Sequence, residues 1–151
     1  MPATRWYVTV AGGADLKRTL RMRRGLPERV LVVEDDADTR LMLVSAIADE
    51  GFEVIPALDG QHALRTALAV EPSAIVLDLM LPEVDGEEFV RAYREQSDVV
   101  APIVVVSARR DAEAVGKRIR ARAVLPKPLD VGEFLARLKA TMKTRSGAAL
   151  A

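Results

Sequence analysis

Four separated segments of the chain end in polar side chains that could act together in one chemical site. Each segment is a short apolar run followed by an acid, a hydroxyl or an amine, in the order Glu34-Asp35-Asp36, Asp78, Ser107 and Lys127. Several carboxylates that meet at one place repel one another, and a divalent cation is the usual remedy. Ligands that are all oxygen atoms favour Mg²⁺ or Mn²⁺ over zinc. The residue types therefore predict a hard divalent cation held by carboxylates.

A carboxylate in such a site can also act as a nucleophile. When a cation neutralises part of the negative charge, one carboxylate can attack phosphorus and form an aspartyl phosphate. The hydroxyl of Ser107 and the ammonium of Lys127 could then hold the phosphoryl oxygens, whose negative charge grows during transfer. The chemistry that this set favours is cation-dependent transfer of a phosphoryl group to an aspartate.

The elements that must bring these residues together alternate along the chain. Apolar runs predict five strands, at residues 30–33, 53–57, 74–78, 103–107 and 123–125. Helical patterns lie between and after the runs and predict five helices. Such βα repeats predict an α/β fold with a doubly wound, five-stranded parallel sheet. In this fold ligands bind at the carboxyl ends of the strands, which is where the polar residues stand.

Local residues indicate where the helices and the domain begin and end. Asp59 and Asp130 precede the second and fifth helical patterns and are expected to cap them. The fourth pattern spans residues 111–122. A chain of this length suits one ordinary domain, so we interpret residues 30–145 as that domain and residues 146–151 as a frayed tail.

Residues 30–143 resemble the response-regulator receiver domain of two-component systems over its whole length. The resemblance rests on four motifs, which are VLVVEDD at 30–36, IVLDLMLPEVDG at 75–86, IVVVSA at 103–108 and LPKPL at 125–129. It implies a flavodoxin-like fold with strand order 2-1-3-4-5. It also implies a stand-alone receiver, because the sequence ends with its fifth helix and leaves no room for a DNA-binding output module.

The resemblance assigns roles to the acidic residues. It makes Asp78 the phosphoacceptor and one of the ligands of a Mg²⁺ ion, with Mn²⁺ as an alternative metal. It gives Asp35 to the metal directly and Glu34 through a water molecule. The backbone carbonyl of Met80 is expected to complete the protein ligands.

The resemblance also assigns the hydroxyl, the lysine and the partners. Ser107 matches the family's switch hydroxyl and Lys127 its phosphate-pairing lysine, with the Lys127-Pro128 bond expected to be cis. The implied donor is a phosphohistidine on a sensor histidine kinase or a phosphotransfer protein. The implied output is a downstream protein bound by the face that the fourth helix, the fifth strand and the fifth helix form.

Two features depart from the common pattern of the family. One is the fourth helical segment, which is short, with 19 residues between Ser107 and Lys127, and rich in arginine, so that we interpret it as a non-standard output face. Many receivers carry an aromatic ring three residues before the lysine, and this chain has Val124 there. We expect the signal to leave by a movement other than the turning of that ring. Met80 and Arg109 lie two residues beyond the acceptor and the switch hydroxyl. Our hypothesis is that they crowd the path of the hydrolytic water, so that the phosphoryl group persists.

Charge is distributed unevenly along the chain. Residues 1–29 hold seven Lys/Arg against two Asp/Glu, whereas residues 30–151 hold fifteen against twenty. The acidic body does not favour nucleic acid. We interpret residues 1–29 as a basic extension that is either disordered or the result of a mis-assigned start, with Met22 as the other start. A partner-binding strand or a basic helix in this extension is the alternative reading.

Composition bears on the compartment. The chain has no cysteine, which excludes disulfides and thiolate metal sites and suits a reducing cytosol. No apolar run approaches the roughly 20 residues that cross a bilayer, and no secretory signal pattern opens the chain. We expect a cytoplasmic protein without a membrane contact.

Other readings of the same residues were weighed. A phosphohydrolase would need a second acid where Met80 stands, and a transcription factor using the arm would need a helix-turn-helix pattern. A pseudo-receiver would lack an acid or the lysine, and none is missing. We therefore expect a signalling phosphoacceptor rather than an enzyme. His62 is read as a solvated side chain, and the arginines of the fourth helix as a solvated face or a contact for an acidic partner.

Overall fold

The computed structural model describes residues 20–21 and 24–150, with side chains up to residue 143. Within this part, the strands are β1 (Arg29–Val33), β2 (Glu53–Ala57), β3 (Ala74–Leu77), β4 (Ile103–Ser107) and β5 (Ala123–Pro126). They form one sheet in the order β2-β1-β3-β4-β5, and every neighbouring pair is parallel. The predicted doubly wound parallel sheet and its strand order are confirmed.

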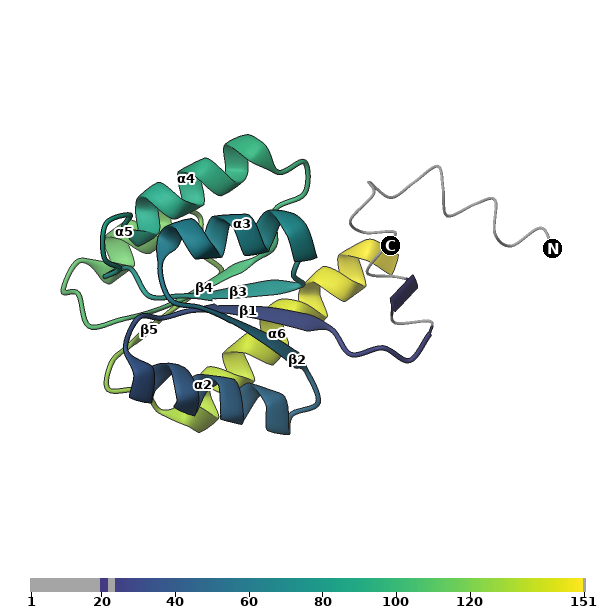
Figure 1. Cartoon of the computed structure of the whole chain (residues 1–151). Coiled ribbons are helices and arrows are strands. Elements are labelled where there is room, and N and C mark those ends of the chain that lie inside the picture. Colours follow the sequence, from purple (N-terminus) through teal and green to yellow (C-terminus); the bar gives the residue numbers. More distant parts are fainter. Residues whose placement is uncertain (1–19, 22–23, 151) are drawn as a thin grey trace.

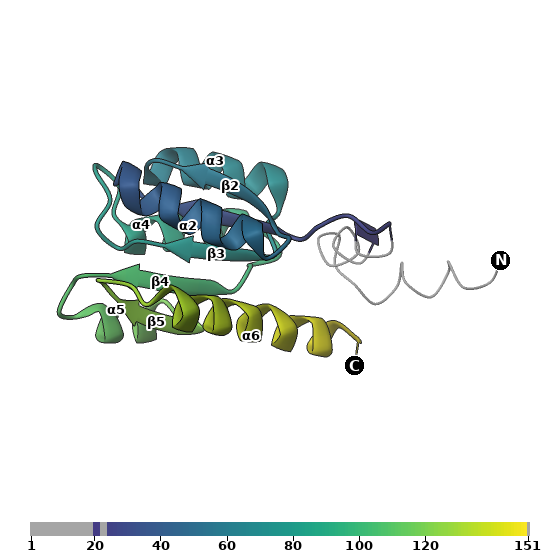
Figure 2. The same cartoon turned by 90° about the horizontal axis from the view of Figure 1, so that it is seen from below.

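Five helices of the described part cover the two faces of this sheet. They are α2 (Ala37–Asp49), α3 (Gly60–Val70), α4 (Gly86–Gln96), α5 (Ala112–Arg118) and α6 (Val131–Leu150). Figures 1 and 2 show α3, α4 and α5 on one face and α2 and α6 on the other. No helix of the described part is both long enough and apolar enough to span a membrane.

The central strands are apolar on both sides because both sides are covered. In β1, Leu31 and Val33 belong to the core under α3, α4 and α5, whereas Val30 and Val32 belong to the core under α2 and α6. All residues of β3 and β4 are buried in the same way. Burial of each such side chain stabilises the fold by roughly 1.5–3 kcal/mol. The two cores therefore hold the strand ends, and the polar residues that follow them, in fixed positions.

Acidic residues cap the helices that follow the strands. The carboxylates of Asp59 and Asp130 accept hydrogen bonds from the backbone N–H groups of His62 and Glu133, at 2.8 and 2.9 Å. Both predicted caps are thus found. Asp36 caps α2 by accepting from Thr39, and this places the start of α2 directly after the acidic end of β1.

Several boundaries differ from the prediction, and β1 and β5 each extend one residue beyond their predicted ranges, to Arg29 and Pro126. The helix predicted over residues 111–122 ends at Arg118, because the chain turns through a left-handed residue before β5. The last helix continues to Leu150, and the fraying predicted for residues 146–151 stays a prediction. Strand β3 ends at Leu77, one residue before Asp78. The readings of the basic extension fall on residues 1–19 and 22–23, which lie outside the described part.

Candidate functional site

Two neighbouring strands place the acidic residues at one edge of the sheet. β1 lies between β2 and β3, so the order of connections reverses between β1 and β3. Glu34 directly follows β1 and Asp78 directly follows β3, and the N–H of Asp78 donates to the carbonyl of Val33 at 3.0 Å. A doubly wound sheet opens a crevice at this point, beyond the carboxyl ends of its strands. The predicted edge therefore exists, and the acidic residues border it.

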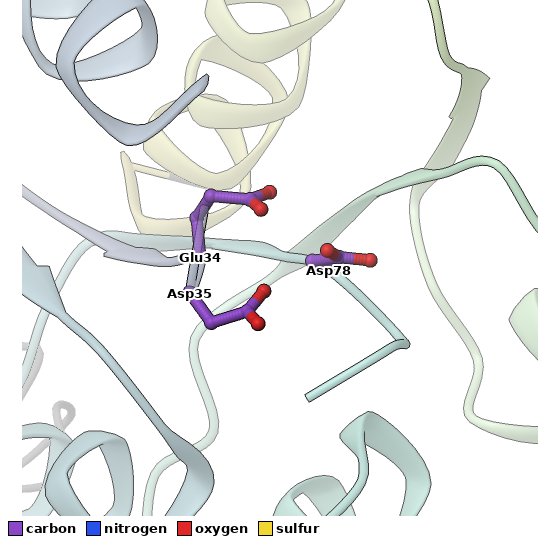
Figure 3. Close-up of side chains that lie close together, drawn as sticks. All are labelled: Glu34, Asp35 and Asp78. Carbon is purple, nitrogen blue, oxygen red and sulfur yellow. The ribbon is translucent and has the colours of Figure 1, made fainter. Parts of the chain in front are cut away.

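Three carboxylates meet there. Glu34, Asp35 and Asp78 each offer an oxygen, and these oxygens all lie within 4.8 Å of one another (Figure 3). Glu34 and Asp78 are only 1% and 5% exposed, whereas Asp35 is exposed. Two buried anions and one solvated anion thus share a small volume that is open to solvent on the side of Asp35.

Lys127 is the cation that bridges the two buried carboxylates. Its Nζ donates to Oε2 of Glu34 at 2.9 Å and to Oδ2 of Asp78 at 3.1 Å. Burial opposes the charge of Lys127, but its hydrogen bonds to the two carboxylates outweigh burial and raise its pKa above the ordinary value. Burial raises the pKa of Glu34, although the hydrogen bond from Lys127 acts in the opposite direction. The ammonium of Lys127 therefore offsets only part of the cost of burying the Glu34 carboxylate.

The residues present fit a hard divalent cation. One ammonium faces three carboxylates, so the cluster keeps an excess of negative charge, and all of its donor atoms are oxygens. Mg²⁺ prefers oxygen ligands and commonly binds through one or two carboxylates with water. Glu34, Asp35 and Asp78 could hold such an ion. The Met80 carbonyl as a further ligand stays a prediction.

Backbone groups fix the direction of the two buried carboxylates. The N–H of Met80 donates to Oδ1 of Asp78 at 3.0 Å, and the N–H of Asp36 donates to Oε1 of Glu34 at 3.2 Å. Each oxygen of Asp78 therefore has a protein donor, one from the backbone and one from Lys127. The Asp78 carboxylate is therefore oriented by one backbone N–H and by a single side chain, that of Lys127.

Arg40 is a positioning residue that the sequence analysis missed. Its guanidinium, from the first turn of α2, donates to the backbone carbonyls of Glu34 and Asp35 at 3.0 and 3.1 Å. The contact ties the acidic loop to the helix that follows it. An arginine one turn after Asp36, the residue that caps α2, was the available indication.

Ser107 lies at the same edge but is not joined to Asp78. Its side chain is buried, and its Oγ accepts from the N–H of Arg109 at 3.2 Å. Among the described hydrogen bonds, none links Ser107 to Asp78. The carbonyl of Ser107 accepts from the N–H of Lys127 at 3.1 Å, so β4 and the lysine segment are adjacent. The Lys127-Pro128 bond is cis, as expected.

Met80, Arg109 and Val124 have distinct surroundings. Met80 is 58% exposed. The guanidinium of Arg109 makes two hydrogen bonds to Asp111, at 2.8 and 2.7 Å, which holds it at the start of α5. Val124 is half-buried, and its Cγ2 lies 2.4 Å from the place that a Cβ on Gly116 would occupy. Val124 thus fills the space that the glycine leaves in α5.

Comparison with known sequences gives one consistent result. Residues 30–139 match the family model of the response regulator receiver domain. The transcriptional regulatory protein PrrA of Mycobacterium leprae is 42% identical over 123 residues, which cover 80% of this chain and 52% of that protein. The response regulator MprA of Mycolicibacterium vanbaalenii is 37% identical over 123 residues, with 78% and 52% covered. The chain spans about half the length of the curated relatives that it matches.

Solved structures with the same architecture agree with this match. The chemotaxis protein CheY4 of Vibrio cholerae superposes with a TM-score of 0.70 at 31% identity, over 76% of this chain and 98% of that one. The receiver domain of the Francisella response regulator 1452 gives 0.72 at 25% identity, over 78% and 98%. Sequence and structure comparisons therefore point to the family that the four motifs resemble.

Proposed function

The chain belongs to the response regulator receiver domain family of two-component signalling, and from that premise we propose that it accepts a phosphoryl group on Asp78. The observation that carries the proposal is the setting of the Asp78 carboxylate. It is nearly buried, oriented by Lys127 and the Met80 N–H, and within 4.8 Å of two further carboxylates. A structural carboxylate needs one cationic partner, not two additional anions beside it.

The proposed step is a displacement at phosphorus. A carboxylate oxygen of Asp78 forms the new P–O bond while the P–N bond of a phosphohistidine breaks. The electron pair of that bond stays on the imidazole nitrogen, which is the leaving group. Lys127 and Ser107 hold the phosphoryl oxygens as their charge grows.

We propose that Glu34, Asp35, Asp78 and the carbonyl of Met80 hold a Mg²⁺ ion. When bound, the ion supplies positive charge that draws the phosphoryl group in and offsets the negative charge of the cluster. Because the lysine ammonium already lies between Glu34 and Asp78, it must shift toward the phosphoryl oxygens when the group arrives. Lys127 would therefore neutralise carboxylate charge before the transfer and phosphoryl charge after it.

The proposed donor is a sensor histidine kinase or a phosphotransfer protein, and the proposed compartment is the cytoplasm. The relatives PrrA and MprA are named as a transcriptional regulator and a response regulator.

For this chain we propose output by phosphorylation-dependent protein binding through α5, β5 and α6. The proposal rests on family membership and on the exposure of that face.

Intact-protein mass spectrometry tests the acceptor directly. After incubation with acetyl phosphate and Mg²⁺, the wild type is expected to gain one phosphoryl group, about 80 mass units. Asp78→Asn, which keeps the shape but removes the nucleophile, is expected to gain none, and EDTA is expected to abolish the gain in the wild type. A folded wild type that binds Mg²⁺ and stays unmodified would instead be a pseudo-receiver.

The lifetime of the phosphoryl group tests the roles of Met80 and Arg109. We propose that these side chains hinder water from reaching the phosphorus opposite the Asp78 oxygen. Met80→Asn with Arg109→Glu is expected to speed loss of the phosphoryl group by about tenfold, since a polar side chain can position the attacking water. Decay is followed by mass after donor removal. Arg110→Glu, the same charge change one residue further on, serves as control, and equal decay of wild type and double variant would contradict the role.

A further inference from the structure

Three cations gather where α5 ends and the chain turns into β5. Lys117, Arg120 and Arg122 are all exposed, and among the described residues their side chains have no ion pair and no hydrogen bond. We call these three residues the basic end of α5. Their neighbour Arg118 differs, because it pairs with Glu87 at 2.9 Å. The basic end is thus a local excess of positive charge on an otherwise acidic body.

The backbone of Arg120 has a left-handed conformation, which an arginine adopts less readily than a glycine. The turn after α5 has paired bonds from the N–H of Ala121 to the carbonyl of Gly116 and from the N–H of Arg120 to that of Lys117. This pattern places one left-handed residue after the helix, and glycine is usual there. Here the residue is Arg120, with φ of 54°. An arginine costs more than a glycine there, so the turn presents a guanidinium at this place at some expense in backbone stability.

A second cationic element faces the same end from α4. Arg94 is partly buried and donates to the carbonyl of Ile119, and burial together with the nearby charge of Arg120 lowers its pKa. The two guanidinium groups therefore repel each other. Arg94 also lines a groove of about 450 Å³ between α4 and the end of α5, in which three arginines outnumber two glutamates, and one of these glutamates, Glu87, is already paired with Arg118. An anion placed here would relieve the repulsion.

We propose that the basic end of α5, with Arg94, docks a carboxylate-rich segment of a partner protein. Charge complementarity favours such a segment. Nucleic acid fits less well, because residues 30–151 hold fifteen Lys/Arg against twenty Asp/Glu, so a long run of phosphates would meet acidic surface outside the patch. In the described part, no aromatic side chain is fully exposed for stacking against bases. The surface does not include Asp78, but it lies at the α5 end of the proposed output face, so the inference rests on that proposal and adds the chemistry of the partner. The mass test of Asp78 and the peptide titration below fail independently of each other.

A titration with a defined probe tests the docking. The ¹⁵N-labelled full chain is titrated with a short peptide rich in Asp and Glu, with the same peptide carrying amides in their place, and with a short DNA duplex. Only the acidic peptide is expected to shift the amide signals of residues 116–123 and Arg94, and salt is expected to weaken binding. Shifts confined to other residues, equal effects of the amide peptide, or stronger binding of DNA to these residues would each overturn the proposal.

Arg120→Gly separates binding from folding. Glycine suits the left-handed backbone, so the melting temperature is expected to stay equal or rise. Loss of the guanidinium is expected to weaken the acidic peptide about three- to tenfold. Arg65→Gln removes an exposed arginine from α3, a helix that α4 separates from α5 (Figure 2), and is expected to change neither quantity. Unchanged peptide affinity in Arg120→Gly would contradict the proposed surface.

Discussion

Replacing Lys127 by methionine is expected to lower the free energy of unfolding by about 3 kcal/mol at neutral pH without Mg²⁺. Methionine keeps most of the length of the side chain but removes the charge that bridges Glu34 and Asp78 at 2.9 and 3.1 Å. Both carboxylates are nearly buried, so each would lose its cation in a setting that water screens poorly. The value lies at the low end for broken buried pairs, because the lysine side chain is 21% exposed.

The loss is expected to depend on pH with a defined sign. Lys127 has a raised pKa, so its pairing stabilises the fold below its ordinary value of 10.5 and is lost as the pH rises through the folded value. In Lys127→Met the pKa of Glu34, already raised from 4.5, rises further. The folded state of the variant then binds more protons than the unfolded state, so the variant regains stability as the pH falls toward 4.5.

Urea denaturation at several pH values, with EDTA present, measures this difference. Lys139→Met is the matched control, because Lys139 pairs with Glu50 at a more exposed site and its loss is expected to cost less than about 1 kcal/mol. Mg²⁺ is expected to restore part of the stability of Lys127→Met, since a bound cation replaces the missing charge. Equal losses in the two variants would mean that the bridge contributes no more than a surface pair.

The fold could be predicted because its strands are buried on both faces. Such strands appear in the sequence as short apolar runs, and β1, β3 and β4 are of this kind. Their polar ends were then readable as residues of one edge, since parallel strands share their carboxyl ends. The strand positions and the neighbourhood of Glu34 and Asp78 both followed from this pattern.

Contacts between distant side chains could not be read from the sequence. Lys127 and Glu34 are 93 positions apart, and no local pattern links them, so the lysine was expected to pair with phosphate alone. The end of α5 was misjudged for a different reason. A glycine would have marked the left-handed turn, but Arg120 occupies it. Sequence reasoning finds such a turn only when the usual residue is present.

Val124, which stands where many receivers carry an aromatic ring, packs against Gly116 of α5. The sequence indicated only that a ring is missing. The structure places the Cγ2 of Val124 2.4 Å from where a Cβ of Gly116 would lie, so the valine is pressed into the backbone of α5. We therefore expect a movement of β5 at this position to displace α5 and the basic end that follows it. The contact of glycine with valine joins the two elements without an aromatic ring.

Replacing Gly86 by alanine is expected to slow phosphoryl uptake by about tenfold or more and to lower the free energy of unfolding by about 2 kcal/mol. Gly86 opens α4, and a Cβ there would lie 2.8 Å from Cα of Leu79 and 3.1 Å from the carbonyl oxygen of Asp78. Both are backbone atoms, so no side chain can turn aside. The segment that carries the acceptor would have to move.

That movement is expected to affect chemistry more than folding, because the displaced atoms belong to the acceptor itself. The N–H of Gly86 also donates to the carbonyl of Leu79 at 3.1 Å, so α4 is joined directly to the residue after Asp78. Gly132→Ala is the control: it lies in the first turn of α6, and its Cβ would meet only an Asp130 oxygen at 3.4 Å. That variant is expected to gain stability and to keep its rate. Rates come from the mass of the phosphorylated chain over time, and a normal rate in Gly86→Ala would show that the acceptor tolerates displacement of its own backbone.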